Sequence, residues 1–184
     1  MMWTPRNLAG FLALAVLLGV AGCRRPQSQP AAVPVATATG EAARLDDMLV
    51  ALHQDYPDTP YQDVAAVLAW QAAGQPWTAV DARPEVERAV STLPHAVLLA
   101  DVLAAPEAWK DKRLVVYCTV GYRSAEATDD LRAAGLTAWN LDGGITAWAH
   151  AAQPLVGPDG QPTKRIHTYS KKWNYLPPGY TPVW

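Results

Sequence analysis

The sequence predicts an α/β domain with a mostly parallel sheet over residues 44–156. Helix-like and strand-like stretches alternate along this segment, as they do in proteins built from βαβ units. Residues 114–117, Leu-Val-Val-Tyr, form a continuous apolar run, which is typical of central parallel strands that are buried on both faces. The segment has about the commonest size of a single domain, so we expect one domain with an appendage at each end.

The overall composition excludes one class of partner. The chain has 184 residues, 50% of them hydrophobic, and a formal net charge of -2. Proteins bind phosphate backbones through a clustered excess of Lys and Arg, which a near-neutral chain does not provide. We therefore expect no nucleic-acid partner.

The N-terminal appendage begins with the pattern of a secretory signal peptide, residues 1–22. One charge, Arg6, precedes an uninterrupted apolar run from residue 8 to residue 20, as in export signals. A helix that spans a bilayer needs about 20 apolar residues, so this run is too short for a permanent membrane span. We therefore expect the protein to be exported.

The end of this segment, Val20-Ala21-Gly22-Cys23, resembles the lipobox of bacterial lipoproteins. The resemblance implies cleavage before Cys23 and attachment of lipid, such as palmitate, to this residue. The alternative is an ordinary signal peptide whose last residue happens to be cysteine. A multiply acylated terminus anchors stably, because each buried methylene contributes about 0.8 kcal/mol. In Gram-negative cells an Arg after the lipidated cysteine, here Arg24, is not a signal for retention in the inner membrane, so the expected location there is the outer membrane facing the periplasm. In other cells it is the outer face of the cell membrane.

Residues 23–43 are expected to be a tether, because residues 24–40 are rich in Pro, Ala, Gln and Thr and lack apolar periodicity. Such a composition cannot bury enough apolar surface to offset the entropy lost on ordering.

Two helices are expected between this tether and the first strand. The first is predicted by helical spacing of apolar residues at 45–52 and the second by the apolar segment 64–69, which should stop at Gly74.

The remaining elements alternate along the chain. We expect strands at 77–80, 96–99, 114–117 and 137–141. The helical segments are expected at 85–89, after Pro84, at 106–109, and at 124–134, ending at Gly135. A turn at Asp142-Gly143-Gly144 should lead into a short helix through Trp148.

The C-terminal extension, residues 157–184, is rich in proline and aromatic residues and more basic than acidic. We expect an extended arm whose rings pack on the domain, because aromatic rings left in water would form a large apolar patch. The alternative is that its basic and aromatic residues contact lipid headgroups or a partner.

The segment 118–124, Cys-Thr-Val-Gly-Tyr-Arg-Ser, carries the candidate chemistry. It lies between a buried strand and a helix N-terminus, where backbone N–H groups and the helix dipole together favour an anion. We expect the Cys118 thiol to ionise readily there, with Arg123 as a nearby cation. Gly121 would let the loop curl where a Cβ would obstruct it.

A lone cysteine at a strand end is often only a small buried apolar residue. If Cys23 carries lipid, however, Cys118 is the only free thiol of an exported protein, where unpaired cysteines are prone to oxidation. It has no partner for an internal disulfide, so a chemical function is favoured.

From about Trp77 to Pro154 the sequence resembles the rhodanese-like sulfurtransferase family. Four segments agree in order with the signatures of that family: DARPEVE at 81–87, STLPHAV at 91–97, CTVGYRS at 118–124, and LDGGI at 141–145 with Trp148. His95 is a departure, since relatives often have glycine there. The resemblance implies a five-stranded parallel sheet flanked by helices on both faces, with the site at the carboxyl ends of the strands.

The resemblance also implies a two-step reaction. The Cys118 thiolate attacks the outer sulfur of a donor such as thiosulfate or a persulfide, and Arg123 helps to neutralise the charge of the donor. A thiol or cyanide-like acceptor then removes the sulfur from the Cys118 persulfide. The substrate-binding loop would consist of Thr119, Val120, Gly121, Tyr122 and Ser124. No cofactor or metal is expected, and a preformed thiolate needs no general base, so His150 and His167 receive no role.

Asp81 and Arg83 are expected to form a structural ion pair that acts on Cys118 only through neighbouring groups. Relatives that act on phosphate or arsenate have a longer loop between the cysteine and the arginine. In this chain four residues, 119–122, separate Cys118 from Arg123, which favours sulfur over phosphate.

Two other functions stay open at this point. The domain could be a non-catalytic binding or sensory module, although such members commonly lose the nucleophile that this chain keeps. It could also be a thiol redox protein that forms mixed disulfides with a protein partner through Cys118.

Overall fold

The computed structural model describes residues 40–184. Its main feature is a five-stranded sheet in the order β1-β5-β4-β2-β3, in which every pair of neighbours is parallel. The strands are β1 (Tyr61–Gln62), β2 (Thr78–Asp81), β3 (Val97–Leu98), β4 (Arg113–Tyr117) and β5 (Thr137–Leu141). The predicted α/β class with five parallel strands is confirmed.

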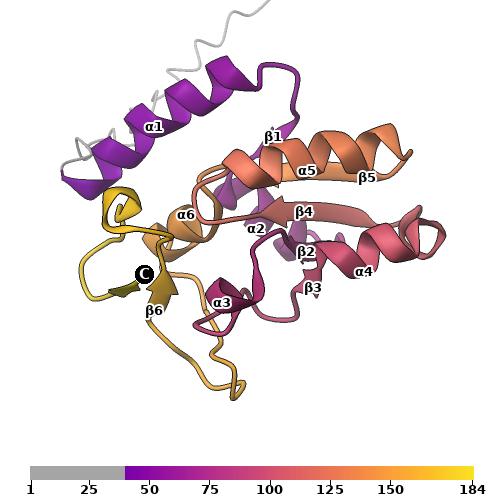
Figure 1. The fold of residues 1–184 in the computed structure, drawn as a ribbon. Coiled ribbons are helices and arrows are strands. Elements are labelled where there is room, and N and C mark those ends of the chain that lie inside the picture. The colour runs from indigo at the N-terminus through magenta and orange to yellow at the C-terminus, as the bar shows by residue number, and fades with distance from the viewer. Residues whose placement is uncertain (1–39) are drawn as a thin grey trace, which may run out of the picture. The chain divides into compact units, whose positions relative to one another are not determined.

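Helices cover both faces of this sheet, with β4 in its middle (Figure 1). The helices of the domain are α1 (Glu41–Asp55), α2 (Val64–Ala72), α3 (Glu85–Arg88), α4 (Leu99–Ala104), η1 (Pro106–Trp109), α5 (Tyr122–Ala133) and α6 (Gly144–His150), and α2, α4, α5 and α6 are the ones that pack on the strands. Side chains alternate along a strand, so Val115 and Tyr117 pack with α2 and α6 while Leu114 and Val116 pack with α4 and α5. Both faces of β4 are therefore buried, which explains its uninterrupted apolar sequence.

Two elements differ from the predictions. A short strand, β1, lies between α1 and α2 and pairs with β5, so the expectation that both helices precede the first strand was wrong. The strand expected at 96–99 is limited to Val97–Leu98, and Leu99 already begins helix α4. Two-residue strands and a six-residue helix are too short to show a hydrophobic period.

The C-terminal extension folds back onto the domain, as Figure 1 shows for the yellow segment beside α1 and α6. It contains β6 (Arg165–His167) and β7 (Thr181–Val183), which pair in parallel, and the short helix η2 (Lys171–Trp173) between them. Ile166 and Leu176 are buried in the core beside α2 and α6, while Trp173 and Tyr175 pack against the cluster formed by α1. The expected packing of the arm on the domain is thus seen for these rings.

His95 has a left-handed backbone, with φ 58°. A side-chain-bearing residue is uncommon in this region, which glycine occupies without steric cost. Such a backbone favours glycine, the residue expected at this position, and His95 is not among the described residues that line the Cys118 cavity.

The predicted signal peptide, the lipid site at Cys23 and most of the predicted tether lie outside the described residues. Helix α1 begins at Glu41, ahead of the domain boundary predicted at residue 44. Within residues 40–184, none of the helices has the length and apolar character needed to cross a membrane.

Candidate active site

Cys118 directly follows β4 and precedes the N-terminus of α5, as the sequence predicted. Its side chain is only 2% exposed, yet it lines a cavity of about 350 Å³. The backbone N–H of Gly121 donates a hydrogen bond to Cys118 Sγ over 3.2 Å. Cys118 therefore lines a cavity with a backbone donor and the positive end of a helix beside its sulfur.

The first turn of α6 binds the backbone carbonyl groups of Cys118 and Thr119. The N–H of Ile145 donates to the carbonyl oxygen of Cys118 over 2.9 Å. The N–H and the hydroxyl of Thr146 both donate to the carbonyl oxygen of Thr119, over 3.2 and 2.8 Å. A Cβ on Gly144 would overlap the carbonyl oxygen of Cys118. Gly144, the second glycine of the LDGGI segment, thus allows α6 to approach the loop and bind its carbonyl groups.

The second half of the loop is fixed in the same way. The carbonyl oxygen of Gly121 accepts hydrogen bonds from Asn140 Nδ2 over 2.9 Å and from Ser124 Oγ over 3.2 Å. Gly121 has φ 117°, and a Cβ there would lie 2.6 Å from a methyl carbon of Leu52. These bonds fix the loop in the conformation in which the Gly121 N–H donates to the thiol.

Arg123 is paired with a buried acid that the sequence analysis did not single out. Its two terminal nitrogens donate to the two carboxylate oxygens of Glu87 over 2.7 and 2.8 Å, and Glu87 is 1% exposed. Thr119 Oγ1 donates to Glu87 and accepts from Arg123. Burial by itself lowers the pKa of Arg123, but the hydrogen bond to Glu87 and the negative charges of Cys118 and Glu87 raise it above its ordinary value.

Asp81 and Arg83 form the expected ion pair, and both are almost fully buried. Arg83 Nη2 and Nε donate to the two Asp81 oxygens over 2.7 and 2.9 Å. The hydroxyl of Tyr117, the residue before Cys118, donates to Asp81 over 2.5 Å and accepts from the N–H of Leu93. Burial and then the charge of Asp81 raise the pKa of Tyr117, so the phenol stays protonated and supports the end of β4.

Replacing Asp81 by asparagine is expected to lower the free energy of unfolding by about 3–5 kcal/mol, because Arg83 would become a buried charge without its counter-ion. Urea unfolding of the purified chain measures this change. The matched control is Glu107→Gln, which breaks the exposed pair of Glu107 with Lys110 and should cost at most about 1 kcal/mol. Equal losses in the two variants would contradict the structural role of Asp81.

Two walls of the Cys118 cavity come from the C-terminal extension. Tyr169 and Trp173 line it together with Cys118, Thr119, Val120, Tyr122 and Arg123. Only the composition of the extension pointed to these rings, since nothing in its sequence indicates which of them reach the cavity. A residue about fifty positions after Cys118 reaches it only through the return of the chain over the domain.

The predicted site residues fall into three groups. Thr119, Val120, Tyr122 and Arg123 line the cavity with Cys118. Gly121 and Ser124 do not line it. Gly121 donates its N–H to Cys118 Sγ, and the hydroxyl of the fully buried Ser124 donates to the carbonyl oxygen of Gly121. Asp81 and Arg83 also lie outside the cavity and reach the loop through Tyr117.

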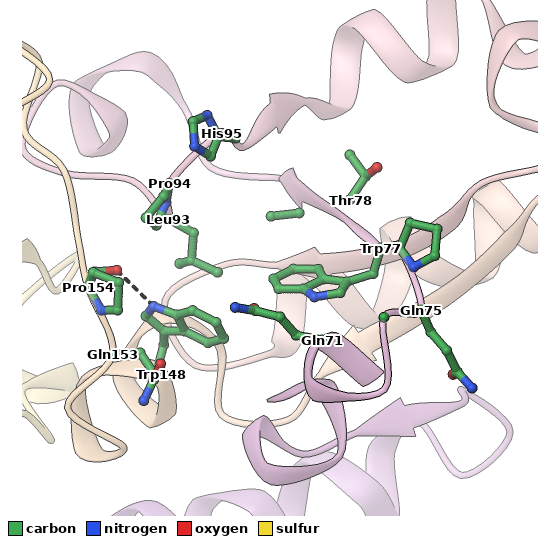
Figure 2. A pocket seen from close by; sticks show the side chains of 13 residues that line it. Gln71, Gln75, Trp77, Thr78, Leu93, Pro94, His95, Trp148, Gln153 and Pro154 are labelled. Atoms are coloured by element: carbon green, nitrogen blue, oxygen red, sulfur yellow. Dashed lines mark hydrogen bonds between the residues drawn. The ribbon is translucent and has the colours of Figure 1, made fainter. Parts of the chain in front are cut away.

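A larger cavity of about 630 Å³ lies at the other end of the sheet, where β2 begins at Thr78. Figure 2 shows the rings of Trp77 and Trp148 in its wall, with the indole N–H of Trp148 donating to the carbonyl oxygen of Pro154. The lining residues that the structure describes include no thiol and no charged side chain, and His95 is the only titratable group among them. Of the two cavities, the one at Cys118 is therefore the one with a thiol and a charged side chain among its described lining residues.

Comparison with known proteins gives the family. The model of the rhodanese-like domain matches residues 64–151. An 85-residue segment is 39% identical to a sulfurtransferase of Allochromatium vinosum, covering 44% of this chain and 79% of that protein. A 91-residue segment is 34% identical to the probable adenylyltransferase/sulfurtransferase MoeZ of Mycobacterium tuberculosis, covering 46% of this chain and only 23% of that longer protein.

Solved structures were also found. A rhodanese-related protein from Thermoplasma volcanium is 24% identical with a TM-score of 0.46, covering 53% of this chain and 97% of that chain. A thiosulfate sulfurtransferase from Pseudomonas aeruginosa is 24% identical with a TM-score of 0.49, covering 64% and 23%. By its matched segment and its identity to the Allochromatium vinosum sulfurtransferase, the chain belongs to the rhodanese-like domain family.

Proposed function

We propose that this protein is a sulfurtransferase that carries sulfane sulfur as a persulfide of Cys118. The observation that supports the proposal most directly is that Cys118 lines a cavity and that its Sγ accepts a hydrogen bond from the N–H of Gly121. A thiolate or a persulfide anion there gains a hydrogen bond from a donor that is already oriented, so little reorganisation is needed during the reaction.

The proposed first step is attack of the Cys118 thiolate on the outer sulfur of a donor. A bond forms between Cys118 Sγ and that sulfur, and the S–S bond of the donor breaks, so that its remainder leaves with the electron pair. With thiosulfate as donor, the leaving group is sulfite. In the second step a thiolate or cyanide attacks the outer sulfur of the persulfide and restores the Cys118 thiolate. No external oxidant or reductant is required.

Intact mass of the full chain, purified in detergent and incubated with a sulfane-sulfur donor, tests the proposal. We expect a mass gain of one sulfur atom that cyanide removes, because cyanide is a thiophilic acceptor. Fragmentation should place the added sulfur on Cys118. If no donor adds sulfur, a non-catalytic binding module is favoured, whereas trapping of a disulfide-linked protein on Cys118 in cells would favour a redox function.

We also propose that lipid on Cys23 anchors the protein to a membrane, in keeping with the resemblance of residues 20–23 to a lipobox. Cys23→Ser is expected to move the protein from the membrane fraction to the soluble fraction of lysed cells, because acyl chains supply the anchoring energy. The matched control is Cys118→Ser, which should stay in the membrane fraction. Unchanged membrane association of Cys23→Ser would refute the anchor.

A further inference from the structure

The charge of the Cys118 cavity is unusual for a site that would take a small dianion. Among the described residues 40–184 that line it, Arg123 is the only one with a charged side chain, and both oxygens of Glu87 already bind its guanidinium. Arg123 and Glu87 cancel each other, so the reactive thiolate leaves this group of side chains with one net negative charge. Like charges repel strongly where water is partly excluded. A donor with two negative charges is therefore disfavoured.

The two lysines that precede the cavity residue Trp173 do not reverse this balance. Lys171 and Lys172 lie on η2 beside Trp173, but their ammonium groups lie over the rings of Trp184 and Trp173, at 5.3 and 5.6 Å from the ring centroids. Neither of them lines the cavity. They can attract anions in general from the solvent without neutralising a donor beside Cys118.

The walls of the cavity are suited to an apolar group. Tyr122 and Trp173 pack edge to face with ring centroids 6.1 Å apart, and Val120 lies beside them. Tyr169 closes another side, with the Arg123 guanidinium 5.8 Å from its ring centroid. Aromatic surfaces of this kind contribute most when they bury another apolar or aromatic group. The volume of about 350 Å³ also lies within the range of about 300–1,000 Å³ that is typical of sites for small organic ligands.

Tyr169 and Trp173 belong to the extension and lie beyond the segment 64–151 that matches the family. Tyr169 has a left-handed backbone with φ 66°, and its N–H donates to His167 Nδ1 over 3.1 Å. A tyrosine in this backbone region is costly and persists only where its surroundings fix it. These surroundings hold Tyr169 at the cavity although 64% of the residue is exposed to solvent.

We infer that the Cys118 cavity selects organic sulfane-sulfur donors that carry an aromatic or apolar group and a single negative charge, in preference to thiosulfate. This inference rests on the proposed sulfurtransferase function and specifies its substrate class. For a thiosulfonate donor, R–SO₂–S⁻, the Cys118 thiolate attacks the outer sulfur and forms the Sγ–S bond. The S–S bond of the donor breaks, and the sulfinate R–SO₂⁻ leaves with the electron pair.

Three donors separate the effects of charge and of apolar surface: thiosulfate, methanethiosulfonate and benzenethiosulfonate. For each donor, the rate of Cys118 persulfide formation is measured as kcat/KM with cyanide as acceptor. It is then divided by the rate at which the same donor reacts with free cysteine, so that the intrinsic reactivity of the donor is removed. We expect the corrected kcat/KM for benzenethiosulfonate to exceed that for methanethiosulfonate by about tenfold or more, because its ring would be buried against Tyr169 and Trp173. Thiosulfate should be the slowest of the three.

Variants of the extension test the origin of the preference. In Trp173→Ala and Tyr169→Ala the ratio of corrected kcat/KM for benzenethiosulfonate to that for methanethiosulfonate should fall several-fold. The matched control is Trp184→Ala, which removes an exposed ring of the same extension outside the cavity and should keep the ratio. Glu87→Gln should raise the rate with thiosulfate relative to methanethiosulfonate several-fold, because the charge of Arg123 would no longer be cancelled.

Equal corrected rates for the three donors, or ratios that do not change in Trp173→Ala and Tyr169→Ala, would overturn the inference while leaving the proposed function in place. If Glu87→Gln does not fold, the two extension variants still decide the outcome. Absence of a Cys118 persulfide with all three donors would instead overturn the proposed function, and the inference with it.

Discussion

Cys118→Ser is expected to abolish sulfur transfer, with kcat/KM lowered on the order of 1,000-fold or more, because a serine hydroxyl stays protonated at neutral pH and is a far weaker nucleophile than a thiolate. The fold should persist. Serine is close to cysteine in size, and its oxygen can accept the hydrogen bond that the N–H of Gly121 donates to Cys118. We therefore expect the free energy of unfolding to change by no more than about 1 kcal/mol.

Two measurements on the same preparation check this expectation: the rate of thiocyanate formation from a sulfane-sulfur donor and cyanide, and urea unfolding. Cys23→Ser removes the other cysteine of the chain and is the matched control, which should retain full transfer in detergent. Transfer by Cys118→Ser at a rate comparable to that of the control would show that the sulfur passes through another group. Loss of the fold would show that the cysteine is mainly a packing residue.

Gly144→Ala is expected to lower the free energy of unfolding by about 2–5 kcal/mol and to impair transfer, because two costs add. Gly144 has φ 56°, where a side-chain-bearing residue is strained, and an added Cβ would overlap the carbonyl oxygen of Cys118 and approach the backbone of Thr119 to 3.0 Å. The start of α6 would have to move away. The hydrogen bonds from Ile145 and Thr146 that hold the loop would then lengthen.

The matched control for this variant is Gly74→Ala. Gly74 has a similar backbone, with φ 67°, but an added Cβ there would meet nothing within 4 Å. Only the cost of the left-handed conformation applies, about 1 kcal/mol, and the rate of transfer should not change. Urea unfolding and kcat/KM are compared for both variants. If Gly144→Ala behaves like Gly74→Ala, the close approach of α6 does not shape the loop.

The features that the sequence predicted are those written in local patterns. The run Leu-Val-Val-Tyr at 114–117 marks a strand that is buried on both faces, and it is the central strand β4. The alternation of apolar segments gave the α/β class. The spacing of the 118–124 segment placed Cys118 between a strand and a helix. Each of these patterns depends on residues within one element or one turn of chain, so they can be read without coordinates.

The sequence by itself therefore determined the class of fold, the position of Cys118 between a strand and a helix, and the short loop between Cys118 and Arg123. Only the tertiary structure decided that Glu87 cancels the charge of Arg123 from 36 positions away, and that Tyr169 and Trp173 wall the cavity. The physical reason is that such contacts depend on how distant segments pack together. Burial and charge pairing between them leave no period or fixed spacing along the chain, whereas the geometry of a single strand or helix does.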